Sequence, residues 1–164
     1  MAKSIKKIVL IGGGVGASTF TRALQKLPIK LTTVVSSFDN GGSTGKIRQD
    51  YHGIAIGDFR QCLLANLALK KDVLTALNHR YGPGHLHHVQ TANVLLKAFF
   101  DSFPNPASGV DKLHELLGLS NSVAPISFTD SEICARLINS KILHGEHAIA
   151  LYQQKRSAEF VELF

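Results

Sequence analysis

The sequence predicts an α/β fold of the Rossmann type, with a mostly parallel sheet and helices on both of its faces. Three successive features predict it: an apolar run that stops at glycines (6–11), a helical pattern of apolar residues (17–27) and a second apolar run (30–35). A strand, a glycine turn, a helix and a strand in this order form a βαβ unit, which implies parallel pairing and a right-handed crossover.

The boundaries of these elements follow from the residues that interrupt them. The first strand stops at Gly12, where three glycines in succession form a turn. The helix carries apolar residues at helical spacing and is closed by Pro28. The second strand runs into another glycine-rich loop at 39–45. Both loops therefore lie at the carboxyl ends of parallel strands, the edge at which open α/β sheets bind ligands.

The rest of the chain predicts further helices and then a group of short strands. Asp58 is expected to be the N-cap of a helix over 59–69. Further helices are expected at 72–81, 89–103 and 110–117, and strands at 123–128, at 133–138 and within 141–150. The tail, 153–164, has the pattern of an amphipathic helix.

Length and composition bound the class of protein. The 164 residues are 45% hydrophobic and 18% charged, enough for one domain with a core and too apolar for a disordered chain. No apolar run approaches the length of a membrane span or a signal peptide, so we expect a cytoplasmic protein without a membrane partner. The net charge of +6 favours an anionic small-molecule partner, while scattered lysines and arginines argue against nucleic acid.

The first glycine loop, Gly12, Gly13 and Gly14, fits a relaxed dinucleotide fingerprint. Glycines let backbone N–H groups approach a phosphate, and the following helix directs its positive end toward it. The alternative is a glycine turn needed only for helix–strand packing. The second strand ends at Ser36 and Ser37 without the acidic residue expected there, which weakens ordinary NAD binding.

The second loop combines flexible backbone with polar side chains suited to a phosphate. Hydroxyls and backbone amides would cradle the phosphate, two cations would neutralise it, and Asp39 would bind Mg²⁺ or a ribose hydroxyl. The candidate residues are Asp39, Asn40, Gly41, Gly42, Ser43, Thr44, Gly45, Lys46 and Arg48. The spacing around Gly45-Lys46 is not that of a P-loop.

A second motif, Gly57-Asp58-Phe59-Arg60-Gln61-Cys62-Leu63, follows nine residues after Arg48. Together with Asp39-Asn40-Gly41-Gly42-Ser43-Thr44-Gly45-Lys46-Ile47-Arg48, it resembles the CofD/YvcK-like family, which includes 2-phospho-L-lactate transferase and the gluconeogenesis factors. The resemblance covers nearly the whole chain. It implies that residues 1–164 are one Rossmann-like nucleotide-binding domain, corresponding to the N-terminal half of a family member. In a later family motif only Asn93 matches in register, because His88 to Asn93 lacks the usual glycines.

The gluconeogenesis-factor branch fits best. The resemblance implies a regulator without turnover that binds a nucleotide sugar of the UDP-N-acetylglucosamine type and links carbon metabolism to cell shape. Gly57, Asp58, Arg60 and Asn93 would then close the wall opposite the two loops. The alternative is a phospholactate-type transferase in which Asp39 and Asp58 hold Mg²⁺, the one cofactor left open. A third reading is a non-binding remnant that forms homo-oligomers through exposed strand edges.

Histidine and cysteine residues give no complete metal site in the sequence. His85 and His87 lie in a short histidine-rich segment that is expected to be a solvated loop, with a metal pair as the alternative. Cys62 and Cys134 form neither a disulfide framework nor a zinc spacing, and both are expected to be buried structural residues.

Overall fold

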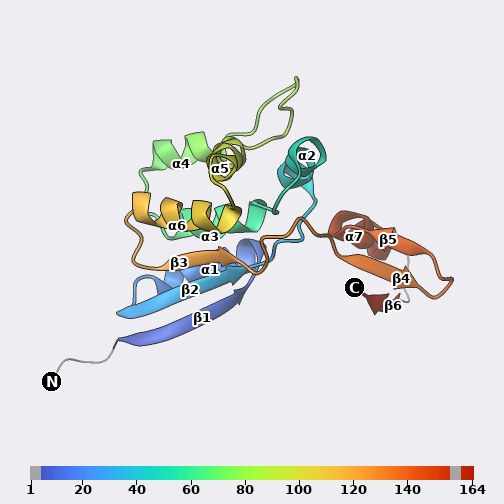
Figure 1. Ribbon diagram of the computed structural model, residues 1–164, viewed down its shortest axis with the longest axis horizontal. Coiled ribbons are helices and arrows are strands. Elements are labelled where there is room, and N and C mark those ends of the chain that lie inside the picture. Colours follow the sequence, from blue (N-terminus) through green and yellow to red (C-terminus); the bar gives the residue numbers. More distant parts are fainter. Residues whose placement is uncertain (1–4, 156–159) are drawn as a thin grey trace.

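The computed structural model describes residues 5–155 and 160–164 of the chain (Figure 1). Its elements form two sheets and a group of helices. In chain order they are β1 (Lys6–Gly12), α1 (Gly14–Leu24), β2 (Ile29–Val35), α2 (Gly42–Tyr51), α3 (Gly57–Ala65), α4 (Lys71–Asn78), α5 (Thr91–Asp101), α6 (Pro106–Leu116), β3 (Ser122–Pro125), β4 (Cys134–Leu137), β5 (Ile142–His144), α7 (Glu146–Lys155) and β6 (Phe160–Leu163).

The first sheet is parallel and has the order β1-β2-β3. Thr33 in the central strand pairs with Leu10 on one side and with Val123 on the other. The α/β class and the parallel sheet flanked by helices are thus confirmed, and the βαβ unit at the start of the chain forms as predicted. The carboxyl ends of β1 and β2 lie at the edge from which both glycine loops leave the sheet.

Helices α1 and α3 pack on the face of this sheet that carries Thr33 and Val35. The hydroxyl groups of Thr21 in α1 and Thr33 in β2 are 3.0 Å apart and buried. On the opposite face, the β1 side chains Val9 and Ile11 are 62% and 73% exposed. Within the described residues, the helices therefore cover one face of β1 and leave its other face open, so the prediction of helices on both faces of the sheet does not hold at this strand.

The core lies between the sheet and the helices above it, as Figure 1 shows for α3 and α6 over β3. Phe59 in α3 is fully buried and meets the ring of Phe100 in α5 edge-on, with centroids 5.5 Å apart. This geometry adds to the stabilisation that apolar burial already supplies. The central residues of the core are Ala17, Val35, Ile47, Ile54, Ile56, Phe59, Cys62, Leu63, Val89, Leu96, Phe100, Val110, Leu113 and Val123.

The second sheet is antiparallel, has the order β5-β4-β6, and lies beside the first with α7 packed on it (Figure 1). Its strands confirm those expected at 133–138 and within 141–150. The tail helix predicted over 153–164 is wrong for its last part, because Phe160–Leu163 pairs with β4 as a strand. Residues 156–159 of that prediction lie outside the described part of the chain.

Two further expectations are corrected. The second glycine loop was expected to be irregular throughout 39–45, but α2 begins inside it, at Gly42. Asp58 is not the N-cap of its helix, because Ile56 occupies that position and Asp58 lies in the first turn of α3. Asp58 instead accepts a hydrogen bond from the backbone of Gly14 in another helix.

In the described ranges 5–155 and 160–164, no helix is both long and apolar enough to cross a bilayer.

Candidate functional site

A small polar hollow of about 480 Å³ lies at the carboxyl edge of the parallel sheet. Its lining residues come from the first glycine turn, the end of β2, the second loop, the start of α3 and the start of α7. They are Gly13, Gly14, Ser36, Asp39, Asp58 and Glu146. Four of these six were predicted as ligand-binding residues, and the structure brings them together.

The glycine turn and Asp58 form one side of this hollow. Gly13 caps α1 in an extended conformation, and Gly14 begins the helix at a φ of +57°. A Cβ atom at Gly13 would collide with the Asp58 carboxylate, and the backbone of Gly14 donates a hydrogen bond to that carboxylate. The N-terminus of α1, where an external phosphate was expected, is thus occupied by an anion from the chain itself.

Negative charge dominates the hollow. Burial raises the pKa of Asp58, and Asp39 and Glu146 raise it further, whereas the Gly14 hydrogen bond and Arg60 act in the opposite direction. Three carboxyl groups facing one small space repel one another unless a proton or a cation intervenes. A cation, an anion that arrives with one, or protonation of one carboxyl group would relieve this repulsion.

Glu146 and Ser36 were missed as site residues. Glu146 is at the start of α7, more than one hundred residues after Asp39 in the chain. The Asn40 side chain helps to hold α7 there, because its Oδ1 accepts a hydrogen bond from the backbone N–H of His147 at 2.9 Å. The sequence offers one signal for Glu146: the segment His144-Gly145-Glu146 resembles an element that members of the CofD/YvcK-like family carry later in the chain.

Several predicted loop residues are buried, and their polar groups contact other parts of the protein. Ser43 is buried, and its hydroxyl oxygen accepts hydrogen bonds from the backbone N–H of Gln90 (2.9 Å) and the side-chain amide of Asn93 (2.8 Å). The Asn93 Oδ1 is buried without a hydrogen-bond partner. Thr44 is buried against Gly57, where α3 begins. These residues hold α2, α3 and α5 together rather than lining the hollow.

The remaining loop residues shape the backbone. The Asp39 carboxylate accepts a hydrogen bond from the N–H of Gly41 at 2.8 Å, which fixes the turn into α2. Gly42 begins α2 at a φ of +47°. Gly45 packs directly on the carbonyl of Asn40. Gly12 ends β1, and a Cβ atom at this position would lie at ordinary van der Waals distance from the Cβ of Ala17.

None of the three predicted cations lines the hollow. Arg48 Nη2 forms an ion pair with Asp130 at 2.6 Å and also donates to the carbonyl of Ser131, which ties α2 to the segment before β4. Lys46 Nζ donates to the carbonyl of His87 at 2.7 Å.

Arg60 is 6% exposed and donates to Asn78 Oδ1 at 2.8 Å, while its Nε is buried without a partner. Burial and the neighbouring Arg80 lower the pKa of Arg60, and Asp58 acts against them. Arg60 lines a different hollow, of about 220 Å³, together with Arg22 and Gln90.

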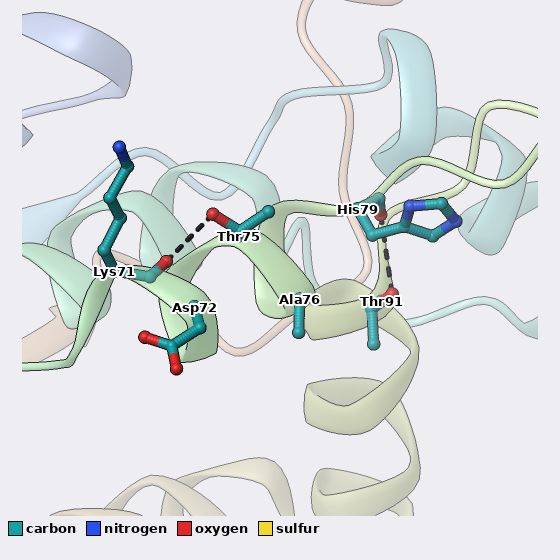
Figure 2. A pocket seen from close by; sticks show the side chains of 6 residues that line it. All are labelled: Lys71, Asp72, Thr75, Ala76, His79 and Thr91. Atoms are coloured by element: carbon teal, nitrogen blue, oxygen red, sulfur yellow. Dashed lines mark hydrogen bonds between the residues drawn. The ribbon is translucent and has the colours of Figure 1, made fainter.

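A larger hollow of about 800 Å³ lies elsewhere, along α4 and the start of α5 (Figure 2). Figure 2 shows that its dashed hydrogen bonds are internal ones, from Thr75 to the carbonyl of Lys71 and from Thr91 to that of His79. It contains none of the predicted ligand-binding residues, and α4 has no buried residue. Figure 2 shows the side chains of Lys71 and Asp72 directed away from each other, so we place the candidate site at the smaller polar hollow, where three carboxyl groups converge.

Comparisons with known proteins identify a family model and several gluconeogenesis factors that match this chain. The sequence profile of the family described as 2-phospho-L-lactate transferase CofD matches residues 8–164. A putative gluconeogenesis factor from Thermoanaerobacterium thermosulfurigenes is 32% identical over 96% of this chain and 49% of its own length. A putative gluconeogenesis factor from Pasteurella multocida is 34% identical over 88% of this chain and 47% of its own length. A gluconeogenesis factor from Listeria innocua is 30% identical over 99% and 51%.

The fold has a counterpart among solved structures. A crystal structure of a UPF0052 family member from Bacillus halodurans superposes with a TM-score of 0.83 at 25% identity, over 99% of this chain and 51% of that one. The chain therefore spans about half the length of each of these relatives.

Proposed function

This chain belongs to the family described as 2-phospho-L-lactate transferase CofD, and within that family we propose that it is a gluconeogenesis-factor-type regulator that binds a nucleotide diphosphate sugar. The observation that carries the proposal is the hollow between the glycine turn and the second loop. It occupies the edge of the parallel sheet where Rossmann-type folds hold the phosphates of nucleotides.

The phosphates would meet both the glycine turn and the carboxylates. The Gly14 N–H, now bonded to Asp58, is the donor that a diphosphate oxygen would take over. A bare diphosphate would be repelled by Asp39, Asp58 and Glu146. We therefore propose that the nucleotide binds with a divalent cation between it and these three side chains.

The donor set fits Mg²⁺. This ion prefers oxygen ligands and is commonly bound by one or two carboxylates together with substrate phosphates. Asp39 and Asp58 would hold it, with Glu146 as a third carboxylate of the same hollow. The ion would supply neutralisation of the diphosphate charge. Ser36, at the end of β2, would donate its hydroxyl to a phosphate or ribose oxygen.

The second candidate function is group transfer. The family description and the carboxylates support it, because a cation on a nucleotide diphosphate also stabilises a departing phosphate. Against it stands the position of Arg48 and Arg60, which are bonded elsewhere and lie outside the lining of the hollow. We therefore favour binding without turnover, with cell-shape and carbon-metabolism control as its proposed outcome.

The test is a thermal-unfolding titration with UDP-N-acetylglucosamine, UDP-glucose, GDP and NAD, each with and without Mg²⁺. A ligand at 100 times its Kd adds about 2.7 kcal/mol to the free energy of unfolding. We expect a UDP-sugar to raise Tm only with Mg²⁺. The Asp39→Asn variant should abolish this rise, because it removes a charge and keeps an acceptor for the Gly41 N–H.

The matched control is Asp72→Asn, which removes a carboxylate from the hollow along α4. It should leave the ligand response unchanged. An equal ligand-induced rise in Tm for Asp39→Asn and the wild-type protein would show that the ligand binds outside this hollow. Turnover of a UDP-sugar during the titration would contradict binding without turnover.

A further inference from the structure

Three potential metal ligands converge on the second sheet, outside the acidic hollow. One ligand atom each from Glu132, Cys134 and His144 lies within 4.8 Å of the other two. His144 Nδ1 is 2.9 Å from Glu132 Oε1 and 3.4 Å from Cys134 Sγ. A single ring nitrogen thus lies within reach of a carboxylate and a thiol together.

The backbone holds these side chains in place. Cys134 and His144 are direct partners in the β4–β5 pair. The neighbouring residues carry the backbone hydrogen bond, from the N–H of Gly145 to the carbonyl of Ile133 (2.9 Å), so Cys134 and His144 form a non-hydrogen-bonded pair. In such pairs the opposing side chains approach most closely. On its other side, Cys134 exchanges two backbone hydrogen bonds with Phe164, of 2.6 and 2.9 Å. Cys134 is therefore anchored on both sides.

Two of the three separations, those from His144 Nδ1, are close to those of a metal site. Zinc–ligand bonds of about 2.3 Å to sulfur and about 2.0–2.2 Å to nitrogen and oxygen, at tetrahedral angles, imply roughly 3.6 Å between S and N and roughly 3.4 Å between N and O. The observed 3.4 and 2.9 Å need widen by only a few tenths of an ångström. The Glu132 and His144 side chains are 45% and 64% exposed, so they can make this adjustment and admit an ion from solvent.

We propose that Glu132, Cys134 and His144 form a binding site for a transition-metal ion of the Zn²⁺ class. A thiolate and an imidazole select Zn²⁺ or Co²⁺ over Mg²⁺ or Ca²⁺, which prefer oxygen ligands alone. Thiolate and carboxylate together neutralise a divalent charge. Three protein ligands leave the fourth tetrahedral position to water.

Such an ion would stabilise a sheet made of short strands. Strands β4, β5 and β6 have four, three and four residues. Units of this size often depend on a metal or another cross-link. The ion would join β4 to the end of β5, two residues before Glu146 of the acidic hollow. The site does not depend on the proposed nucleotide binding.

The test is titration of the tag-free chain with Co²⁺, followed by visible and near-ultraviolet absorption. We expect one equivalent to produce tetrahedral d–d bands and a thiolate-to-cobalt charge-transfer band, both lost on adding Zn²⁺. Zn²⁺ should also raise Tm in the absence of nucleotide. Cys134→Ser should abolish the charge-transfer band, and His144→Ala should weaken binding at least tenfold.

Cys62→Ser is the matched control, because Cys62 is the other cysteine and lies buried in the core. It should keep the full spectrum. Circular dichroism of each variant establishes that it is folded. Absence of the charge-transfer band in the wild-type protein, its persistence in Cys134→Ser, or its loss in folded Cys62→Ser would each overturn the proposal.

Discussion

Gly45 of the second loop is expected to be required for packing and not for ligand approach, and substituting it with alanine tests this. Gly45 is in the first turn of α2, and its N–H donates to the carbonyl of Gly41 at 2.9 Å. A Cβ atom there would lie 2.8 Å from the carbonyl carbon of Asn40 and still closer to its oxygen. Both are backbone atoms, so they cannot rotate away.

The expected magnitude is the difference between two opposing effects. Overpacking costs about 1–3 kcal/mol, and the upper end applies because the neighbour is backbone. Replacing glycine with alanine in a helix returns about 1 kcal/mol. The net loss of stability is therefore about 2 kcal/mol, and Tm should fall by about 4–8 °C for a chain of this size.

Gly16→Ala is the matched control. Gly16 is in the first turn of α1, and a Cβ atom there meets nothing within 4 Å. This variant should gain about 0.5–1 kcal/mol. The measurement is urea unfolding of both variants without ligand, where the midpoint should change and the slope should not. A Gly45→Ala variant as stable as Gly16→Ala would refute the close approach of α2 to the Asn40 carbonyl.

The other predictions concern charge, burial and the open sheet face. Asp58→Asn should raise Tm at pH 7, because it relieves repulsion in the acidic hollow and keeps an acceptor for the Gly14 N–H; a lower Tm would show that the charge is stabilising. Burial raises the pKa of Cys62 to about 11, so its thiol should resist iodoacetamide at pH 8 until urea unfolds the chain, and stability should fall as pH rises from about 9 to 11. Arg48→Ala should cost about 2–3 kcal/mol without any ligand, since it breaks charge-assisted bonds to Asp130 and two carbonyls, and an unchanged urea midpoint would contradict this. The exposed Val9 on the edge strand β1 should promote self-association, so light scattering should give a mass above 17.8 kDa that Val9→Lys lowers; a wild-type monomer would argue against it.

The elements of the fold were predictable where neighbours in the sequence decide them. The apolar run before Gly12 and the β-branched run of β2 fix their strands, because strand and helix periodicities are local properties. Local patterns failed at the tail, where Phe160–Leu163 becomes a strand by pairing with β4. An amphipathic pattern cannot show that a partner strand is available.

The glycine-rich loops and their acidic residues were also visible in the sequence, and the family followed from their motifs. Only the tertiary structure decided what each side chain does there. Ser43 and Asn93 bond to each other, Arg48 reaches Asp130, and Glu146 joins the acidic hollow from the far end of the chain. In the same way, Glu132, Cys134 and His144 show no metal spacing in sequence but meet across an antiparallel pair. The physical reason is that residue type sets which chemistry a side chain can perform, while long-range packing sets which other groups it meets.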